Sequence, residues 1–227
     1  MTAPATYVLV PGAWCGGFIW RAVADGLRSR GHRVFAPTLT GLADRSHLIS
    51  PEIDLETHVI DVVNLIKWEE LNDIVLVGHS YGGMVVSGVA ERLAPGAIRS
   101  IVYLDAFYAP SGQSVMDCAA PMEALFQQDP VPFAFAGQTG NPHFETLVTP
   151  HPRRTFTDRP SLTGARDRIG LKTYVVATKP ATPWFAAMGE ELRKTPGWRV
   201  RDLPCGHATM LEMPEETVAL LEEAAEG

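Results

Sequence analysis

Residues 73–93 read DIVLVGHSYGGMVVSGVAERL. An apolar run typical of a buried strand, DIVLV, precedes a glycine-rich corner, and a run typical of a helix follows it. The corner itself, GHSYG at residues 78–82, fits the pattern G-x-S-x-G. Glycines on both sides of the serine let neighbouring backbones pass closely, so the pattern predicts a tight strand-to-helix turn. Such a turn presents the hydroxyl of Ser80 above a sheet, close to the N-terminus of the helix.

Strand-like and helix-like runs alternate on both sides of this corner. Further strands are predicted for TYVLV (6–10), HRVFAP (32–37), SIVYL (100–104), KTYVVAT (172–178) and WRVRDL (198–203). Further helices are predicted for residues 18–31, 54–70, 183–195 and 214–226. Several strand-like runs are continuously apolar, which is typical of a parallel sheet with helices on both faces. We therefore expect an α/β fold of about six mainly parallel strands, as a single domain over residues 1–227.

The alternation is interrupted at roughly residues 109–168. This stretch is rich in Pro, Gly and aromatic residues, as in VPFAFAGQTGNPHF (131–144), and it contains one short helix candidate, MEALFQQ (122–128). A gap of this length inside a compact domain is usually functional or belongs to an inserted element. We interpret it as a small cap over the carboxyl ends of the strands. An unstructured surface loop is the alternative, and the aromatic content argues against it.

Composition and charge limit the partners. The chain has 227 residues, a net charge of −7, 46% hydrophobic residues and no basic patch, which argues against nucleic acid or an anionic membrane as a partner. Its apolar runs are far shorter than the roughly 20 residues that cross a bilayer. The N-terminal sequence lacks the pattern of a secretory signal, so we expect a cytoplasmic protein. The oligomeric state is left open, a homodimer included.

The cysteines indicate neither a disulfide framework nor a metal site. Cys15, Cys118 and Cys205 are widely separated and odd in number, and no Cys or His pair has the spacing of zinc ligands. Buried thiols that behave as small hydrophobic residues are the simplest interpretation. We expect no metal and no cofactor.

A serine nucleophile needs a base, and in this architecture the base follows it in the chain. Of the seven histidines, His207 alone lies far downstream in a loop after the last predicted strand, behind Gly206 and before the final helix. His143 and His151 fall in the cap. A lone histidine is more often structural, but together with the serine corner His207 is predicted to be the general base.

The acid of a triad is harder to place. The loop after the penultimate strand contains no carboxylate, and the next acids, Glu190 and Glu191, fall inside the following helix. Asp105, by contrast, ends an apolar strand directly after the helix that follows Ser80, where an unpaired charge would be costly. We predict that Asp105 accepts a hydrogen bond from His207. A loop cap or a partner for an arginine is the alternative role.

Backbone N–H groups would complete the site. The N–H of Tyr81 follows the nucleophile, and the loop after the first strand, VPGAWCGGF (10–18), supplies a second donor, for which Ala13 is the best candidate. Trp14, Phe107 and Trp184 lie close in sequence to these elements and are predicted to form apolar walls that bind substrate. Packing in the core is an almost equal alternative for these three side chains.

Together these segments resemble the α/β-hydrolase superfamily. The likeness is carried by residues 7–41, LVGHSYGGMV (76–85), YLDAFYAP (103–110) and GHATMLEMPEE (206–216), and it covers roughly residues 6–110 and 170–225. Within the superfamily the chain is similar to the branch of plant methyl-ester esterases, hydroxynitrile lyases and related bacterial carboxylesterases. The resemblance implies an α/β-hydrolase fold with a short cap and a Ser-His-Asp catalytic triad.

Two departures from that branch matter. Plant members carry the triad acid after the penultimate strand, where this chain has Pro180, and the acid here is expected at Asp105 instead. The lyases of the branch carry a lysine directly after the catalytic histidine and a threonine in the oxyanion loop, where this chain has Ala208 and Ala13. Lyase chemistry needs a cation for the departing cyanide, so an esterase is favoured.

The sequence therefore predicts a carboxylesterase that cleaves a small to medium, mostly uncharged ester through an acyl-enzyme. Its partner would be a small-molecule methyl or aryl ester, or a lactone. A cofactor-free lyase or C–C hydrolase on the same fold is one alternative. A ligand receptor built on an inactive hydrolase fold is the other, and the set of triad residues counts against it.

Overall fold

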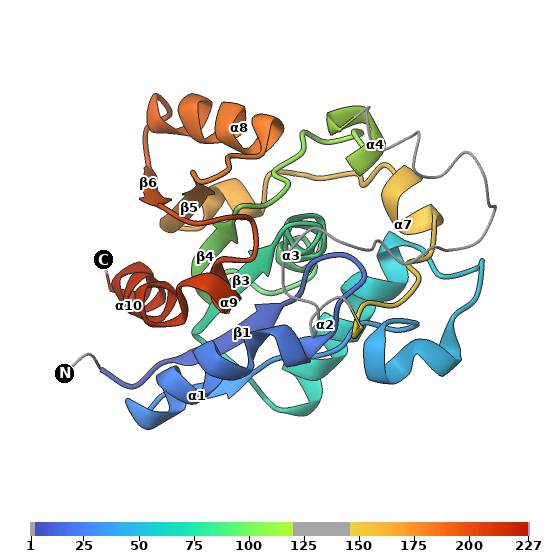
Figure 1. Cartoon of the computed structure of the whole chain (residues 1–227), viewed down its shortest axis with the longest axis horizontal. Coiled ribbons are helices and arrows are strands. Elements are labelled where there is room, and N and C mark those ends of the chain that lie inside the picture. The colour runs from blue at the N-terminus through green and yellow to red at the C-terminus, as the bar shows by residue number, and fades with distance from the viewer. Residues whose placement is uncertain (1–2, 120–145, 227) are drawn as a thin grey trace.

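A computed structural model describes residues 3–119 and 146–226. Its centre is one six-stranded sheet in the order β2-β1-β3-β4-β5-β6, with neighbouring strands parallel (Figure 1). The strands are β1 (Thr6–Val10), β2 (Arg33–Phe35), β3 (Ile74–His79), β4 (Ile98–Leu104), β5 (Leu171–Ala177) and β6 (Trp198–Leu203). The predicted six-stranded parallel architecture is confirmed.

Helices cover both faces of this sheet. The longer ones are α1 (Arg21–Ser29), α2 (Leu55–Trp68), α3 (Gly82–Ala90), α8 (Pro183–Arg193) and α10 (Pro214–Ala225). Short helices are η1 (Gly17–Trp20), η2 (Ala43–Leu48), α4 (Val115–Cys118), α7 (Arg154–Thr157), η4 (Arg166–Arg168) and α9 (Thr209–Glu212). Side chains of α1 and α10 enter one hydrophobic core, and those of α2, α3 and α8 enter the other.

Continuous apolar strands feed both cores at once. In β1, Val8 and Val10 belong to the core beneath α2 and α3, whereas Tyr7 and Leu9 belong to the core beneath α1 and α10. Successive side chains of a strand point to opposite faces, so a strand buried on both faces needs apolar residues at every position. This requirement explains why TYVLV shows no alternation of polar and apolar residues.

Strand β2 is shorter than the predicted run at residues 32–37. It pairs only with β1, through three residues beginning with Arg33 opposite Thr6. Pro37 has no N–H to donate to a ladder, and Thr38 next to it accepts a hydrogen bond from the Gly17 N–H through its hydroxyl. The chain therefore leaves the sheet early and turns toward the loop after β1.

The described parts of the predicted cap lie on either side of residues 120–145. Helix α4 precedes that segment, and α7 and η4 follow it. Helix α7 lies beside both α4 and α2 (Figure 1). The helix predicted at residues 122–128 falls outside the described residues. The assignment of 109–168 as a cap on a single domain stays a prediction.

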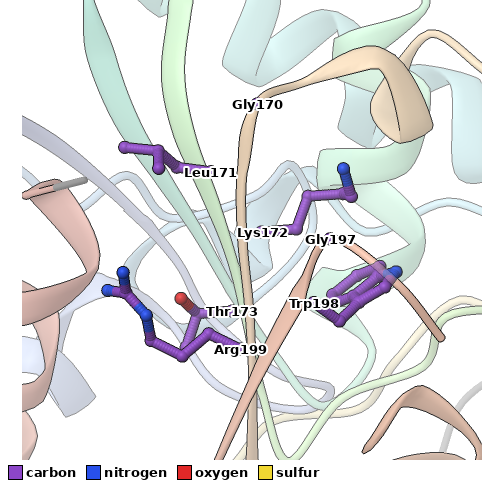
Figure 2. A pocket seen from close by; sticks show the side chains of 7 residues that line it. All are labelled: Gly170, Leu171, Lys172, Thr173, Gly197, Trp198 and Arg199. Atoms are coloured by element: carbon purple, nitrogen blue, oxygen red, sulfur yellow. The ribbon is translucent and has the colours of Figure 1, made fainter. Parts of the chain in front are cut away.

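A polar cavity of about 220 Å³ lies at the amino ends of β5 and β6 (Figure 2). Its two cationic side chains already have partners, since Lys172 Nζ donates to the carbonyls of Asp167 and Ile169 and Arg199 donates to the carbonyl of Glu223. Loops at the carboxyl ends of the strands, including the one that follows β3, lie at the opposite edge of the sheet. The cavity therefore plays no part in the site described below.

Candidate active site

Ser80 lies in the turn between β3 and α3, and its backbone is left-handed with φ of 54°. Its N–H donates to the carbonyl of Leu104 at 3.3 Å, and its carbonyl accepts from the N–H groups of Gly83 and Phe107 at 3.1 Å. A serine avoids a left-handed backbone unless its surroundings enforce it, because the side chain then crowds the carbonyl. These bonds to the ends of β4 and α3 hold the strained turn in place.

The two glycines of the motif are required by close backbone contacts. A Cβ at Gly78 would lie 2.6 Å from the carbonyl oxygen of Gly82, and a Cβ at Gly82 would lie 2.7 Å from that of Pro11. Neither distance is compatible with a side chain. The turn at residues 78–82, which we call the elbow, is therefore packed directly against the loop that follows β1. The glycines of the sequence pattern predict such close backbone packing.

Asp105 and His207 meet at the carboxyl edge of the sheet. His207 Nδ1 lies 2.6 Å from Asp105 Oδ2, and the second carboxylate oxygen of Asp105 accepts from the N–H of Ala177 at 3.1 Å. Asp105 is fully buried and has a left-handed backbone, with φ of 44°. Because Oδ2 is an acceptor, His207 carries its proton on Nδ1 and leaves Nε2 free to act as a base.

Three further contacts fix the loop that carries His207. The N–H of Gly206 donates to Glu212 at 2.8 Å, and His79 Nε2 lies 2.9 Å from the carbonyl oxygen of His207. The ring of Phe185 stacks on the imidazole of His207, with centroids 5.3 Å apart and planes 11° apart. His207 is thus held by His79, which lies in the turn before Ser80, and by Phe185 of α8.

Ser80 and His207 lie on the same rim of the sheet. His79, the residue before Ser80, packs its ring against that of His207 at 4.6 Å. Within the described residues no hydrogen bond joins the Ser80 hydroxyl to His207. Catalytic hydrogen bonds in unliganded enzymes are often long and close only when substrate binds, so the predicted pairing of Ser80 with His207 stays a prediction.

The predicted oxyanion donors flank Ser80. A Cβ at Gly12 would lie 3.0 Å from Ser80 Cβ, which shows how closely the loop after β1 approaches the nucleophile. In the described part of the chain, neither the N–H of Ala13 nor that of Tyr81 donates to a protein acceptor. This arrangement is compatible with the predicted role of both N–H groups as oxyanion donors, which stays a prediction.

The three predicted pocket side chains have different surroundings. Phe107 is buried and packs edge-on against Phe185, at a centroid distance of 4.9 Å. Trp14 packs against Phe156 at 5.7 Å, and Trp184 is half-buried on α8 beside Phe185. These contacts place all three near the rim. Their role in substrate binding stays a prediction.

Sequence reasoning missed Phe185 and gave no role to His79 or His151. Phe185, Gly189 and Leu192 are the buried residues of α8, at a spacing of about one helical turn. That periodicity favours Phe185 over Trp184 as the inward residue and could have identified it. No local pattern marks the contacts of the two histidines, because each bonds to a backbone group far away in the sequence.

Burial controls the charge of these groups. It lowers the pKa of His79 and of His151 well below the usual histidine range, and the neighbouring His207 and His58 act in the same direction. Both rings are therefore neutral near pH 7. Burial also raises the pKa of Cys15 to about 12 and that of Cys205 to about 11, so neither thiol is an available nucleophile.

The described residues contain neither a membrane-spanning helix nor a metal-binding cluster. No helix within residues 3–119 and 146–226 is long and apolar enough to cross a membrane. Over the same ranges, no cluster of three or more His, Cys, Asp or Glu side chains could hold a metal ion.

Known proteins resemble this chain in sequence and in fold. The chain is 38% identical to a carbendazim hydrolyzing esterase of Nocardioides sp. over 93% of its own length and 96% of the relative. It is 31% identical to a pyrethroid hydrolase of Sphingobium wenxiniae over 63% of this chain and 46% of that one.

Among solved structures, an extracellular alpha/beta-hydrolase from a Paenibacillus species superposes with a TM-score of 0.86. The two chains are 24% identical, and the match covers 99% of this chain and 100% of that one, so it supports the fold alone. The model of the alpha/beta hydrolase family matches residues 7–220. The chain belongs to the alpha/beta hydrolase family.

Proposed function

We propose that this protein is a carboxylic ester hydrolase that uses Ser80 as nucleophile, His207 as base and Asp105 as the acid of the triad. The observation that carries the proposal is the 2.6 Å hydrogen bond between the buried Asp105 and His207, on the rim beside a serine in a left-handed elbow. The esterase that shares 38% identity over nearly the full length of both chains supports the same reaction class.

The reaction follows from the positions of these groups. His207 Nε2 removes the hydroxyl proton of Ser80 as the serine oxygen attacks the ester carbonyl, and Asp105 stabilises the imidazolium that forms. The N–H groups of Ala13 and Tyr81 donate to the oxyanion. His207 then protonates the leaving alcohol, and water releases the acid from Ser80 by the reverse sequence.

The substrate is a small to medium, mostly uncharged ester. Aromatic side chains, among them Trp14, Phe107 and Trp184, supply apolar walls and no charge. Methyl esters, aryl esters and lactones fit this description, and carbendazim belongs in the same test panel because of the related esterase. In this proposal residues 1–227 form one domain with a cap at 109–168.

Labelling and turnover test the proposal together. We expect a fluorophosphonate probe to label the wild-type protein at Ser80, and S80A to lose the label and at least about 10³-fold of its kcat on p-nitrophenyl acetate. A folded wild-type protein that resists the probe would point to a ligand receptor. Release of cyanide from a cyanohydrin, with no nitrophenol from the ester, would identify a lyase.

The cytoplasmic location and the oligomeric state stay predictions. One structural neighbour is described as extracellular. Cell fractionation and light scattering on the purified protein would decide these two points.

A further inference from the structure

His151 is a fully buried histidine with no part in the triad. It lies in the segment that returns from residues 120–145 and reaches the loop after β1. The backbone N–H of Trp14 donates to His151 Nδ1 at 3.1 Å, across 137 positions of sequence. Trp14 directly follows Ala13, the proposed oxyanion donor.

The hydrogen bonds of His151 define its tautomer. Because Nδ1 accepts from the Trp14 N–H, it carries no proton, and the proton is on Nε2. Nε2 lies 2.8 Å from the hydroxyl of Thr155, which itself donates to the carbonyl of Pro152 at 2.7 Å. Every polar atom of this chain of bonds has a partner, so the ring has one favoured orientation.

The backbone of Trp14 needs such support. Its φ of 62° is left-handed, a conformation that a bulky residue such as tryptophan rarely adopts. The same returning segment holds the other side of the residue, because the N–H of Thr149 donates to the carbonyl of Trp14 at 2.9 Å. The peptide planes on both sides of Trp14 are therefore fixed by residues 149–151.

His151 also contacts the residue that carries the second donor. Its ring packs edge-on against Tyr81 at a centroid distance of 4.8 Å. The Tyr81 hydroxyl in turn donates to Nδ1 of His58, whose Nε2 donates to the carbonyl of Thr40 at 2.9 Å. One buried imidazole thus contacts Tyr81, which supplies one of the proposed oxyanion N–H groups, and Trp14, the neighbour of Ala13, which supplies the other.

We propose that neutral His151 is a positioning residue for the oxyanion hole, acting through the bond from the Trp14 N–H to its Nδ1. The inference rests on the proposed function, since it assigns the Ala13 and Tyr81 N–H groups to the oxyanion. The burial of the ring keeps it neutral, and a protonated His151 could not accept this bond. Among the described residues, the polar groups that face the ring are His58, Tyr81, Thr155 and the N–H of Trp14, and the apolar ring of Phe156 packs against it.

Two substitutions of His151 distinguish the loss of its hydrogen-bond acceptor from the loss of the volume of its ring. H151L removes the acceptor, whereas H151N places an amide oxygen close to the position of Nδ1. For hydrolysis of p-nitrophenyl acetate we expect H151L to lower kcat and kcat/KM together by about 10- to 100-fold. We expect H151N to stay within about 5-fold of the wild type.

The chain offers a matched control in His32. It is also buried, and its Nδ1 accepts the backbone N–H of Ala5 at 3.1 Å, at the amino end of β1 and away from Ser80. H32L therefore loses the same kind of bond, and we expect its kcat to stay within about 2-fold of the wild type. A purely structural role for His151 would give H151L and H32L equal kcat values at equal fractions folded, and this result would overturn the proposal. Equal losses in H151N and H151L would also overturn it.

A measurement on the unmodified protein covers the case in which H151L fails to fold. In ¹⁵N-histidine-labelled wild type, the ring assigned to His151 by its absence in H151N should show a bare Nδ1 and a protonated Nε2. A proton on Nδ1 would contradict the proposal. Failure of the proposed function is distinct, because S80A would then hydrolyse ester as fast as the wild type.

Discussion

At the scale of single residues, the two oxygens of Asp105 make different bonds. Oδ1 accepts the N–H of Ala177 and Oδ2 faces Nδ1 of His207. In D105N the amide oxygen would keep the bond to Ala177, so the NH₂ group would face His207 and force the imidazole proton onto Nε2. The base would then be blocked. Asparagine tolerates a left-handed backbone, so D105N should fold.

We expect D105N to lower kcat by about 10³- to 10⁴-fold in steady-state ester hydrolysis. The control is E190Q, because Glu190 is exposed on α8 and pairs with Arg193 at 3.5 Å. It should keep full turnover. Normal activity in D105N together with a large loss in E190Q would mean that the acid was assigned to the wrong residue.

The residues of the candidate site differ in how well the sequence alone predicts them. Ser80 and His207 follow from the motif and from chain order, and Asp105 follows from its position after an apolar strand. Phe185 was reachable through the period of α8. The bond from Trp14 to His151 was not, because it joins segments 137 residues apart and no local preference records which backbone N–H a distant imidazole accepts.

At the scale of elements, the start of α2 shows how the returning segment is attached to the sheet domain. Asp54, at the N-cap, accepts from the N–H and the hydroxyl of Thr57 at 2.9 and 2.7 Å. Its other oxygen lies 3.4 Å from the guanidinium of Arg154, at the start of α7. One side chain therefore caps a helix and meets the segment that carries His151.

We expect D54A to lower the free energy of unfolding by about 1 kcal/mol, the usual loss when a capping side chain is removed. D54S keeps a capping hydroxyl but loses the charge that faces Arg154. That ion pair is largely exposed and is worth less than about 1 kcal/mol. Urea unfolding should therefore place D54S close to the wild type. A D54A midpoint equal to that of the wild type would contradict this role.

Strands and long helices were predictable because each has its own periodic pattern and an end signal, as with Asp54 before α2. The end of β2 was placed too late, since Pro37 and the partner of Thr38 lie outside the local pattern. The short helices α4 and α7 were not predicted. Helices of four residues bury too little surface for a period to appear, and tertiary contacts determine them.

At the scale of the whole molecule, buried neutral histidines link folding to pH. Burial lowers the pKa of His58 to about 4 in the folded state, whereas an unfolded histidine titrates near 6.5. Between these values the unfolded chain binds a proton that the folded chain does not. The stabilising effect is complete above about pH 6.5 and is lost as the pH falls toward 4.

We expect the free energy of unfolding to fall by up to about 1.4 kcal/mol for each pH unit below 6.5 on account of His58 alone. Urea unfolding at pH 7.5, 6 and 5 measures this dependence. H58N should flatten the curve by that amount, and H47N, at an exposed histidine, should follow the wild type. An H58N curve parallel to the wild-type curve would show that His58 does not contribute.

The left-handed backbones of Trp14, Ser80 and Asp105 have a consequence for laboratory evolution. Glycine adopts such a conformation without the crowding that a Cβ creates, so glycine would relieve backbone strain at each of these positions, although at Trp14 it would also remove the packing against Phe156. At Ser80 and Asp105 the same change would remove a side chain of the proposed triad. A selection for thermal stability alone would therefore favour variants that have lost catalytic activity. It has to be combined with a screen for turnover.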